Sequence, residues 1–273
     1  MKTLLKRAVA AVLATGTIAF AASAQSSGLR SLNTENAALA WQAVGRLDAK
    51  NGYCTGTLIS PDLVLTAAHC VFDAQGKPLK AETLTFNAGL TGGNAVARRS
   101  VVQIEVNPNY DPTTTISANN VRHDVAMVRL EEPIPTSVLD PFRVHQGTLP
   151  NGPVSVVSYG RGRSSNLSRQ DSCQVVQNYQ QILTMDCNVT FGSSGAPVFT
   201  HLNGRGRIVS IISGIGQQAG KQYAYGMELP TLVAELKRKM YANKVRPTAT
   251  IRRLQTGSGK SSSGAKFVTV GGS

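Results

Sequence analysis

The sequence has few of the residues that mark several common kinds of site. Its four cysteines form no C-x-x-C pair, which argues against a zinc or thioredoxin-like site. No two of its four histidines have the spacing of metal ligands. One tryptophan and seven tyrosines are too few for a surface on which nucleic-acid bases stack. No motif recurs at a fixed period, so a repeat architecture is not expected.

Acidic residues are also scarce. Fifteen Asp and Glu stand against 28 Lys and Arg, which gives a formal net charge of +13. Three of the bases lie within residues 1–24 and six lie within residues 243–273, and neither segment contains an acid. The body between them therefore carries only +4 and does not indicate nucleic-acid binding. The basic tail is suited to contact anionic surfaces.

Long apolar runs are absent except at the start of the chain. The run from Ala8 to Ala22 follows three basic residues and ends on Ala22-Ser23-Ala24. This order predicts a secretory signal peptide, residues 1–24, cleaved after Ala24. A membrane anchor would need about 18 or more continuous apolar residues. We therefore expect a soluble protein that is secreted or periplasmic, where disulfides form.

Residues 41–229 consist of short apolar segments separated by Gly, Pro, Asn and Asp, a pattern typical of β-sandwiches and barrels. Val102, Ile104 and Val106 alternate with polar residues, as in a half-buried strand. The stretch 131–153 holds five of the 12 prolines and separates two β-rich halves. The pattern is compatible with one large β domain or two small barrels.

One helix is expected, over residues 231–242. Its apolar residues from Leu232 to Met240 share a face, and an early acid is followed by late bases, which suits the helix dipole. Residues 243–273 are rich in Gly, Ser and Thr and predict a flexible basic tail. Residues 25–40 are interpreted as an N-terminal segment or a short propeptide.

The first stretch that suggests chemistry is Leu63–Cys70, where an apolar strand end leads through small residues to His69. A lone histidine is more often structural than catalytic. Cys54 lies 16 residues before Cys70, and a bridge between them would pin the histidine loop and contribute about 3 kcal/mol in the chain-entropy model. Four cysteines nevertheless allow three pairings, among which the spacing does not choose.

The second stretch, His123–Leu130, has Asp124 at the head of an apolar strand. An ordinary strand-opening aspartate is the alternative interpretation. Most other aspartates lie among turn residues, where hydrogen bonds to the local backbone explain them. The alternatives to Asp124 are Asp48, Asp62, Asp73, Asp111, Asp140, Asp171 and Asp186.

The third stretch, Phe191–Phe199, is a glycine-bracketed serine loop. Glycine allows consecutive backbone N–H groups to converge on one point. Those of Gly192 and Ser194 could bind an oxyanion, which is worth about 10² to 10³ in rate per donor. A plain Gly/Ser turn is the alternative, but the order His, Asp, Ser across the three stretches favours catalysis.

In that order, TAAHC, HDVAMVRL and GSSGAPV resemble the three catalytic motifs of trypsin-like (chymotrypsin-fold) serine peptidases. WQAVGRL, CTGTLIS and VVSYG extend the resemblance over residues 41–242. It implies an all-β fold of two antiparallel six-stranded β-barrels, about 41–140 and 150–230, with the active site between them and a C-terminal helix. The stretches DCN and SGAPVF are similar to the bacterial glutamyl-endopeptidase-like branch.

The resemblance also implies roles. Ser194 is the nucleophile, His69 the general base and acid, and Asp124 orients the imidazole. No metal or organic cofactor is required, the substrate is a protein or peptide, and a monomer is expected. The implied disulfides join Cys54 to Cys70 and Cys173 to Cys187.

Two positions depart from the family pattern. The aspartate that usually precedes the nucleophile, and pairs with the new N-terminal amine after zymogen cleavage, is Ser193 here. That activation switch is therefore not expected. Ala196 replaces a glycine, which is a small change beside the nucleophile.

The substrate pocket is expected at Asn188 and Thr190, with a wall of Ser213, Gly214 and Ile215. An Asp at position 188 would have favoured Lys or Arg substrates, and a histidine at position 212 would have favoured Glu. Neither is present, so we expect a mostly neutral pocket.

The sequence has features of two rival functions. An α/β-hydrolase esterase carries a similar serine turn, but residues 192–196 lack its last glycine and only His201 follows the serine. A catalytically weak or inactive scaffold could act in binding through the basic tail. Retention of all three triad residues favours catalysis, and the sequence predicts an exported serine endopeptidase.

Overall fold

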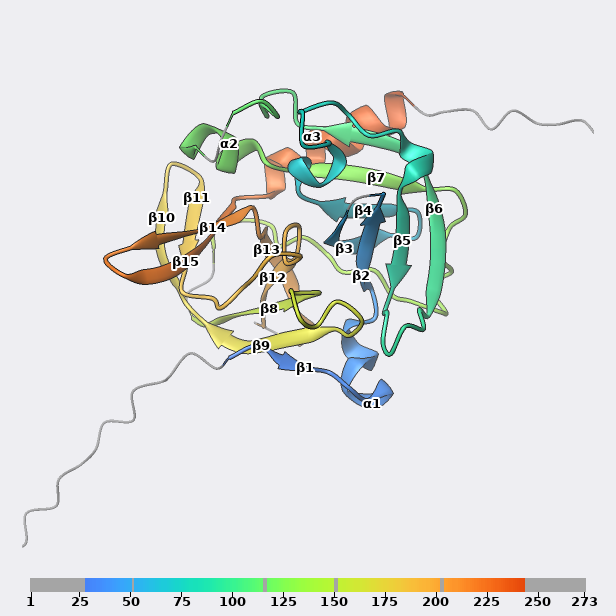
Figure 1. Ribbon diagram of the computed structural model, residues 1–273, viewed down its shortest axis with the longest axis horizontal. Coiled ribbons are helices and arrows are strands. Elements are labelled where there is room, and N and C mark those ends of the chain that lie inside the picture. The colour runs from blue at the N-terminus through green and yellow to red at the C-terminus, as the bar shows by residue number, and fades with distance from the viewer. Residues whose placement is uncertain (1–27, 51, 115–116, 150–151, 202–203, 244–273) are drawn as a thin grey trace, which may run out of the picture.

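The computed structural model describes residues 28–50, 52–114, 117–149, 152–201 and 204–243 (Figure 1). The predicted signal peptide and the basic tail from residue 244 lie outside these ranges. Strands dominate, as predicted, and two separate β-rich halves are visible in Figure 1. None of the helices within the described ranges has both the length and the apolar character needed to cross a membrane.

The first half closes into a six-stranded antiparallel barrel, which confirms that part of the predicted fold. Around the ring the strands are β2 (Val44–Ala49), β3 (Gly52–Ser60), β4 (Leu63–Thr66), β7 (Ala126–Leu130), β6 (Ala97–Val106) and β5 (Thr85–Ala88). β5 pairs with both β6 and β2, and this second pairing closes the ring. Every residue of β4 and β7 is buried, as expected for their apolar runs.

Glycine makes room at the centre of this barrel. A Cβ atom on Gly45 would lie 2.4 Å from the Phe86 ring, and one on Gly56 would lie 2.7 Å from Val64. Phe86 is fully buried. The absence of these two Cβ atoms therefore allows the Phe86 ring and the Val64 side chain to fill space that would otherwise be overpacked.

The second half contains two sheets. The first has the order β1 (Arg30–Ser31), β9 (Ser168–Cys173), β8 (Val154–Ser158), β12 (Pro197–Thr200), β13 (Arg207–Ile211). The second has the order β10 (Val175–Tyr179), β11 (Ile182–Met185), β15 (Lys221–Met227), β14 (Gly214–Gln218). Only Gln174 separates β9 from β10, and only two residues separate β13 from β14.

Those short connections carry the chain from one sheet into the other at two places. If β9 with β10 and β13 with β14 are each taken as one bent segment, six segments surround the core of this half. The arrangement is consistent with the predicted second barrel, although its hydrogen bonds form two sheets rather than one closed ring. One residue at the first bend and two at the second interrupt the ladder, and the sequence pattern does not reveal them.

An aromatic cluster joins the two halves. The Phe199 ring of β12 lies 4.5 Å from that of Phe142 and 5.2 Å from that of Trp41, between ring centroids. Phe142 belongs to the Pro-rich stretch that the sequence marks as the seam. Leu32, just after β1, is buried as well, so the segment before Trp41 packs onto the body.

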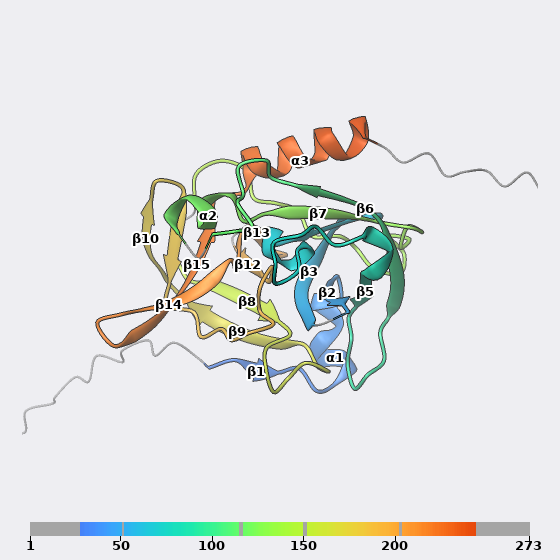
Figure 2. The same ribbon diagram turned by 45° about the horizontal axis from the view of Figure 1, so that its top comes forward.

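The predicted C-terminal helix is present as α3 (Pro230–Ala242). It packs against β6 and β7 (Figure 2) and buries Val233, Leu236 and Met240. Each such side chain contributes about 1.5 to 3 kcal/mol. The structure adds two short helices that the sequence analysis did not predict, α1 (Glu35–Ala38) and α2 (Ala118–His123).

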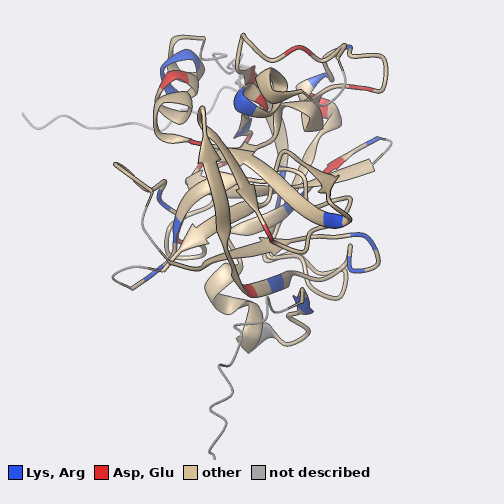
Figure 3. Cartoon of the chain, turned by 90° about the vertical axis from the view of Figure 1, so that its left-hand side faces the viewer, with Lys and Arg blue, Asp and Glu red and all other residues tan. Residues whose placement is uncertain are grey.

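Charged residues are scattered over the face seen in Figure 3, where blue and red segments are interspersed among uncharged ones. This agrees with the modest +4 charge that the sequence assigns to the body.

Candidate active site

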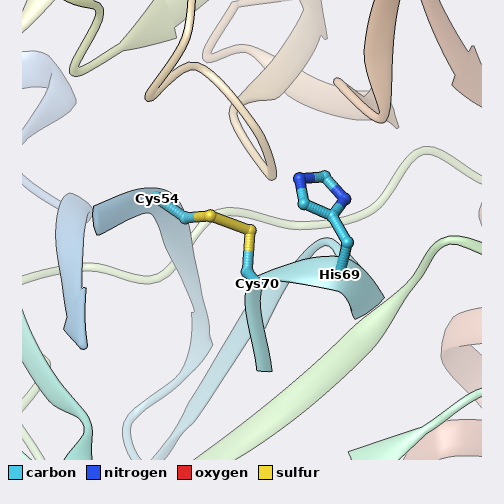
Figure 4. A group of neighbouring side chains, drawn as sticks. All are labelled: Cys54, His69 and Cys70. Atoms are coloured by element: carbon cyan, nitrogen blue, oxygen red, sulfur yellow. A yellow bond between two sulfur atoms is a disulfide. The ribbon is translucent and has the colours of Figure 1, made fainter. Parts of the chain in front are cut away.

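The chain on both sides of His69 is fixed in place. It lies in a short 3₁₀ turn (Ala68–Val71) that directly follows the buried strand β4. The neighbouring Cys70 forms a disulfide with Cys54 of β3 (Figure 4). The second disulfide joins Cys173 to Cys187, so the pairing in the structure is the one that the resemblance implies.

Within the described ranges, one group of potential metal ligands comes together: Cys54, His69 and Cys70, whose ligand atoms lie within 4.8 Å of one another. Both sulfurs are bonded to each other. A disulfide offers no thiolate, so this group is not a metal site in the oxidised protein.

Asp124 lies immediately after α2 and is almost completely buried. Its carboxylate accepts three hydrogen bonds. His69 donates from Nδ1 at 2.8 Å and from its backbone N–H at 2.9 Å, and the Ser213 hydroxyl donates at 2.6 Å. A carboxylate can only accept, so the proton of the neutral imidazole is on Nδ1, and Nε2 is left as the basic nitrogen.

α2 explains why Asp124 has this position. The Ser117 hydroxyl caps the helix by accepting from the Asn120 backbone N–H. The helix ends at His123, and β7 begins two residues after Asp124. The sequence signal for this helix was the serine three residues before Asn120, which the strand-based interpretation overlooked.

The electrostatics of the pair determine the protonation of His69. Burial, the largest effect, lowers the pKa of His69, whereas the negative charge and hydrogen bond of Asp124 raise it and together prevail. The net direction is upward. Burial and the same carboxylate also raise the pKa of Tyr110, so its hydroxyl stays protonated beside the site.

Two glycines shape the serine loop. Gly192 has φ +88° and Gly195 has φ +75°, a region that favours glycine. A Cβ on Gly195 would lie 2.3 Å from Thr66 Oγ1 and 2.8 Å from the Ala67 nitrogen. Gly195 therefore packs directly against the segment that leads into His69.

Both halves of the molecule hold this loop. The Thr55 N–H of β3 donates to the Ser194 carbonyl at 2.8 Å, and the Thr55 hydroxyl donates to the Gly192 carbonyl at 2.8 Å. From the second half, the Ile212 carbonyl accepts from the Gly195 N–H at 2.7 Å. Ser194 is thus fixed where the first barrel meets the second half.

A family model described as Trypsin matches residues 31–236, well over half of the chain. The chain belongs to this family. The match includes His69, Asp124 and Ser194.

Similar proteins include a glutamyl endopeptidase from Bacillus licheniformis, 25% identical over 173 residues, and the serine protease SP24D from Anopheles gambiae, 29% identical over 154 residues. The alignments cover 63% and 54% of this chain, and 53% and 51% of those proteins. The chain therefore spans about half the length of the curated relatives it matches.

A solved structure of a Glu endopeptidase in complex with MPD is similar to this fold. The TM-score is 0.64 at 17% identity, over 79% of this chain and 97% of that one. Together with the Bacillus relative, this likeness supports the predicted position of the chain near the bacterial glutamyl-endopeptidase-like branch of the trypsin family.

Ser193, where the trypsin family usually has aspartate, is fully buried. Its hydroxyl lies 3.0 Å from that of Ser158, which is also fully buried, and accepts weakly from the Thr190 N–H at 3.4 Å. The Ser193 N–H donates to the Thr190 carbonyl at 3.0 Å. Hydrogen bonds between uncharged groups thus hold the serine loop at the position where the family usually has a charged aspartate.

The predicted pocket residues are only partly brought together. Thr190 lies beside the serine loop, whereas Asn188 is exposed and its N–H bonds to Gln170. Gly214 and Ile215 begin β14 and are half-buried. Ser213, predicted as pocket wall, is buried and bonded to Asp124.

Sequence reasoning missed a cavity of about 200 Å³ beside the His69–Asp124 pair. The other residues that line it are Tyr110, Thr114, Asn120, Val121 and Ser213. α2 supplies two of them, so the cavity could not be predicted without that helix.

Proposed function

We propose that this protein is an exported serine endopeptidase with His69, Asp124 and Ser194 as its catalytic triad. The observation that carries the proposal is the buried Asp124 carboxylate, which accepts from His69 Nδ1 at 2.8 Å. This bond leaves Nε2 as the base. The Asp124 carboxylate also accepts from the His69 backbone N–H and from the Ser213 hydroxyl. A histidine with a purely structural role would not need a carboxylate fixed in this way.

The mechanism follows from these roles. Ser194 Oγ attacks the scissile carbonyl carbon while His69 Nε2 takes its proton. The C–N bond then breaks and His69 returns the proton to the leaving amine, which leaves an acyl group on Ser194. Water activated by His69 hydrolyses that ester. Throughout, Asp124 holds the imidazole tautomer and stabilises its cation.

The oxyanion is bound by the backbone N–H groups of Gly192 and Ser194. Neither N–H has a hydrogen-bond partner among the described residues, whereas those of Ser193 and Gly195 are bonded. Positive φ at Gly192 and Gly195 gives the turn its shape. Each donor is worth about 10² to 10³ in rate.

Export is supported by the signal-peptide pattern of residues 1–24 and by two disulfides, which persist in oxidising compartments. We infer that residues 28–40 stay in the mature protein, because β1 pairs with β9 and Leu32 is buried. The substrate is a protein or peptide, and a mostly neutral pocket remains the expectation.

The test is labelling of the purified mature protein with a fluorophosphonate probe, in parallel with casein turnover. Ser194→Ala is the matched variant, because it removes only the hydroxyl. We expect labelling and cleavage by the parent protein and neither by the variant. Folded protein that is not labelled and does not cut would instead favour the binding-scaffold alternative.

A further inference from the structure

Two aromatic rings, each covered by an arginine, flank Gly192, whose N–H is proposed to bind the oxyanion. The Arg161 guanidinium lies 4.4 Å from the centroid of the Phe191 ring, and that of Arg46 lies 5.4 Å from the Tyr53 ring. Phe191 immediately precedes Gly192 in the chain. Tyr53 lies against Gly192 itself, since a Cβ there would lie 2.5 Å from its ring. We call Arg46, Tyr53, Phe191 and Arg161 the leaving-group rim.

The position of this rim relative to the scissile bond follows from His69. In the proposed mechanism His69 gives its proton to the leaving amine, so the departing peptide passes His69. The next residue, Cys70, is bonded to Cys54, and Cys54 follows Tyr53 in β3. We therefore expect the departing peptide to run over the Cys54–Cys70 bridge toward Tyr53 and Phe191.

The two arginines of the rim differ in whether a carboxylate neutralises their charge. Arg46 is bonded to both carboxylate oxygens of Asp48. Arg161 is exposed, and among the described residues no carboxylate lies within ion-pair distance of it. Phe191 is 65% exposed, so its ring is held in water beside the catalytic loop.

The backbone of Arg161 is fixed although its head group is unpaired. Its N–H donates to the Phe191 carbonyl at 2.7 Å and contacts Thr190 Oγ1 at 3.1 Å. The guanidinium keeps five donors in one plane, which match a carboxylate in bidentate geometry. A cation and an apolar ring at one position fit a side chain with a carboxylate on a short apolar stem.

We propose that the leaving-group rim is a subsite for acidic substrate residues, Glu or Asp, at the first or second position after the scissile bond. Arg161 binds the carboxylate and Phe191 packs against the stem. The inference rests on the proposed function, because it concerns the substrate of the same site.

The experiment starts from a casein peptide that the protein cuts, with the cut located by mass spectrometry. Internally quenched versions carry Glu or Gln at the first or second position after the cut, and kcat/KM is measured for each. Arg161→Gln removes the cation. Arg238→Gln removes an equal charge from an exposed position on α3 and is the matched control.

We expect the parent protein to prefer Glu over Gln by about fivefold at one of these positions, the upper range for an exposed ion pair. Arg161→Gln should abolish the preference, Arg161→Lys should keep part of it, and Arg238→Gln should keep all of it. The preference should also decline in 1 M NaCl, since salt screens exposed charges.

Equal rates for Glu and Gln peptides, or a preference that survives Arg161→Gln, would overturn the inference and leave the proposed function standing. If no peptide is cut and the fluorophosphonate probe does not label Ser194, the proposed function fails and the inference fails with it.

Discussion

Ser213 Oγ lies 2.6 Å from Asp124 Oδ2, the same oxygen that accepts from the His69 ring. The strand connection from β13 to β14 thus reaches across from the second half to hold an acid of the first half. The serine is predicted to line the substrate pocket, and its hydroxyl also holds Asp124, the acid bonded to the imidazole of His69.

Ser213→Ala should lower kcat/KM by about 10- to 100-fold, because a hydrogen bond to a charged group is worth about 1.5 to 3 kcal/mol. The loss should fall on kcat more than on KM, since the hydroxyl is committed to Asp124. Ser210→Ala is the control, because it removes another fully buried hydroxyl, which donates to the Met227 carbonyl. An equal loss of activity in both variants would contradict this role.

The pH dependence of kcat/KM should report His69. Only the neutral imidazole is a base, so activity should appear as pH rises through a pKa above the usual value of about 6.5. Asp124→Asn removes the negative charge that raises this pKa, so the acidic midpoint should move to lower pH. The value of kcat/KM on the plateau at high pH should fall about 10⁴-fold in this variant, by analogy with other triads. An unchanged midpoint would argue against the pairing.

The Ser158–Ser193 hydrogen bond predicts that activity does not depend on a new N-terminus. A version with extra residues before Gln25 should keep its kcat, and no alkaline loss should occur near the amine pKa of about 8. Ser193→Ala and Ser158→Ala should each lower kcat several-fold. The double variant should be little worse than either single one, because both remove the same bond. Additive losses would indicate two independent effects.

Removal of the Cys54–Cys70 bridge should destabilise the protein by about 3 kcal/mol and lower kcat, because it ties the His69 turn to β3. The variant Cys54→Ser/Cys70→Ser measures this by thermal unfolding and turnover. Cys173→Ser/Cys187→Ser removes the other bridge, which closes a loop of similar length, and is the control for stability alone. Non-reducing peptide mapping that joins Cys54 to Cys187 would contradict both expectations.

The sequence supports prediction best where function or burial forces a local pattern. The alternation in β6, the apolar runs of β4 and β7, and the amphipathic α3 were all predictable. The three motifs around His69, Asp124 and Ser194 were also predictable. In each motif the polar residue stands beside small or apolar residues that fit a tight turn or a buried strand.

Prediction failed where the partner is far along the chain. Ser213 and Asp124 are 89 residues apart, and Ser158 and Ser193 are 35 apart, so no local pattern reveals either bond. The assignment of Asn188 to the pocket rests on spacing alone and stays a prediction; its side chain is exposed. α2 has six residues, too few for a helical period to emerge.

The division of the site between the two halves also has a consequence for synthesis. His69 and Asp124 belong to the part of the chain that is made first, whereas the loop of Ser194 is held by the Ile212 carbonyl, and Ser213 then reaches back to Asp124. A nascent chain that stops before residue 212 lacks both of these contacts. We therefore expect both contacts, and with them peptidase activity, to form only after the second half of the chain is complete.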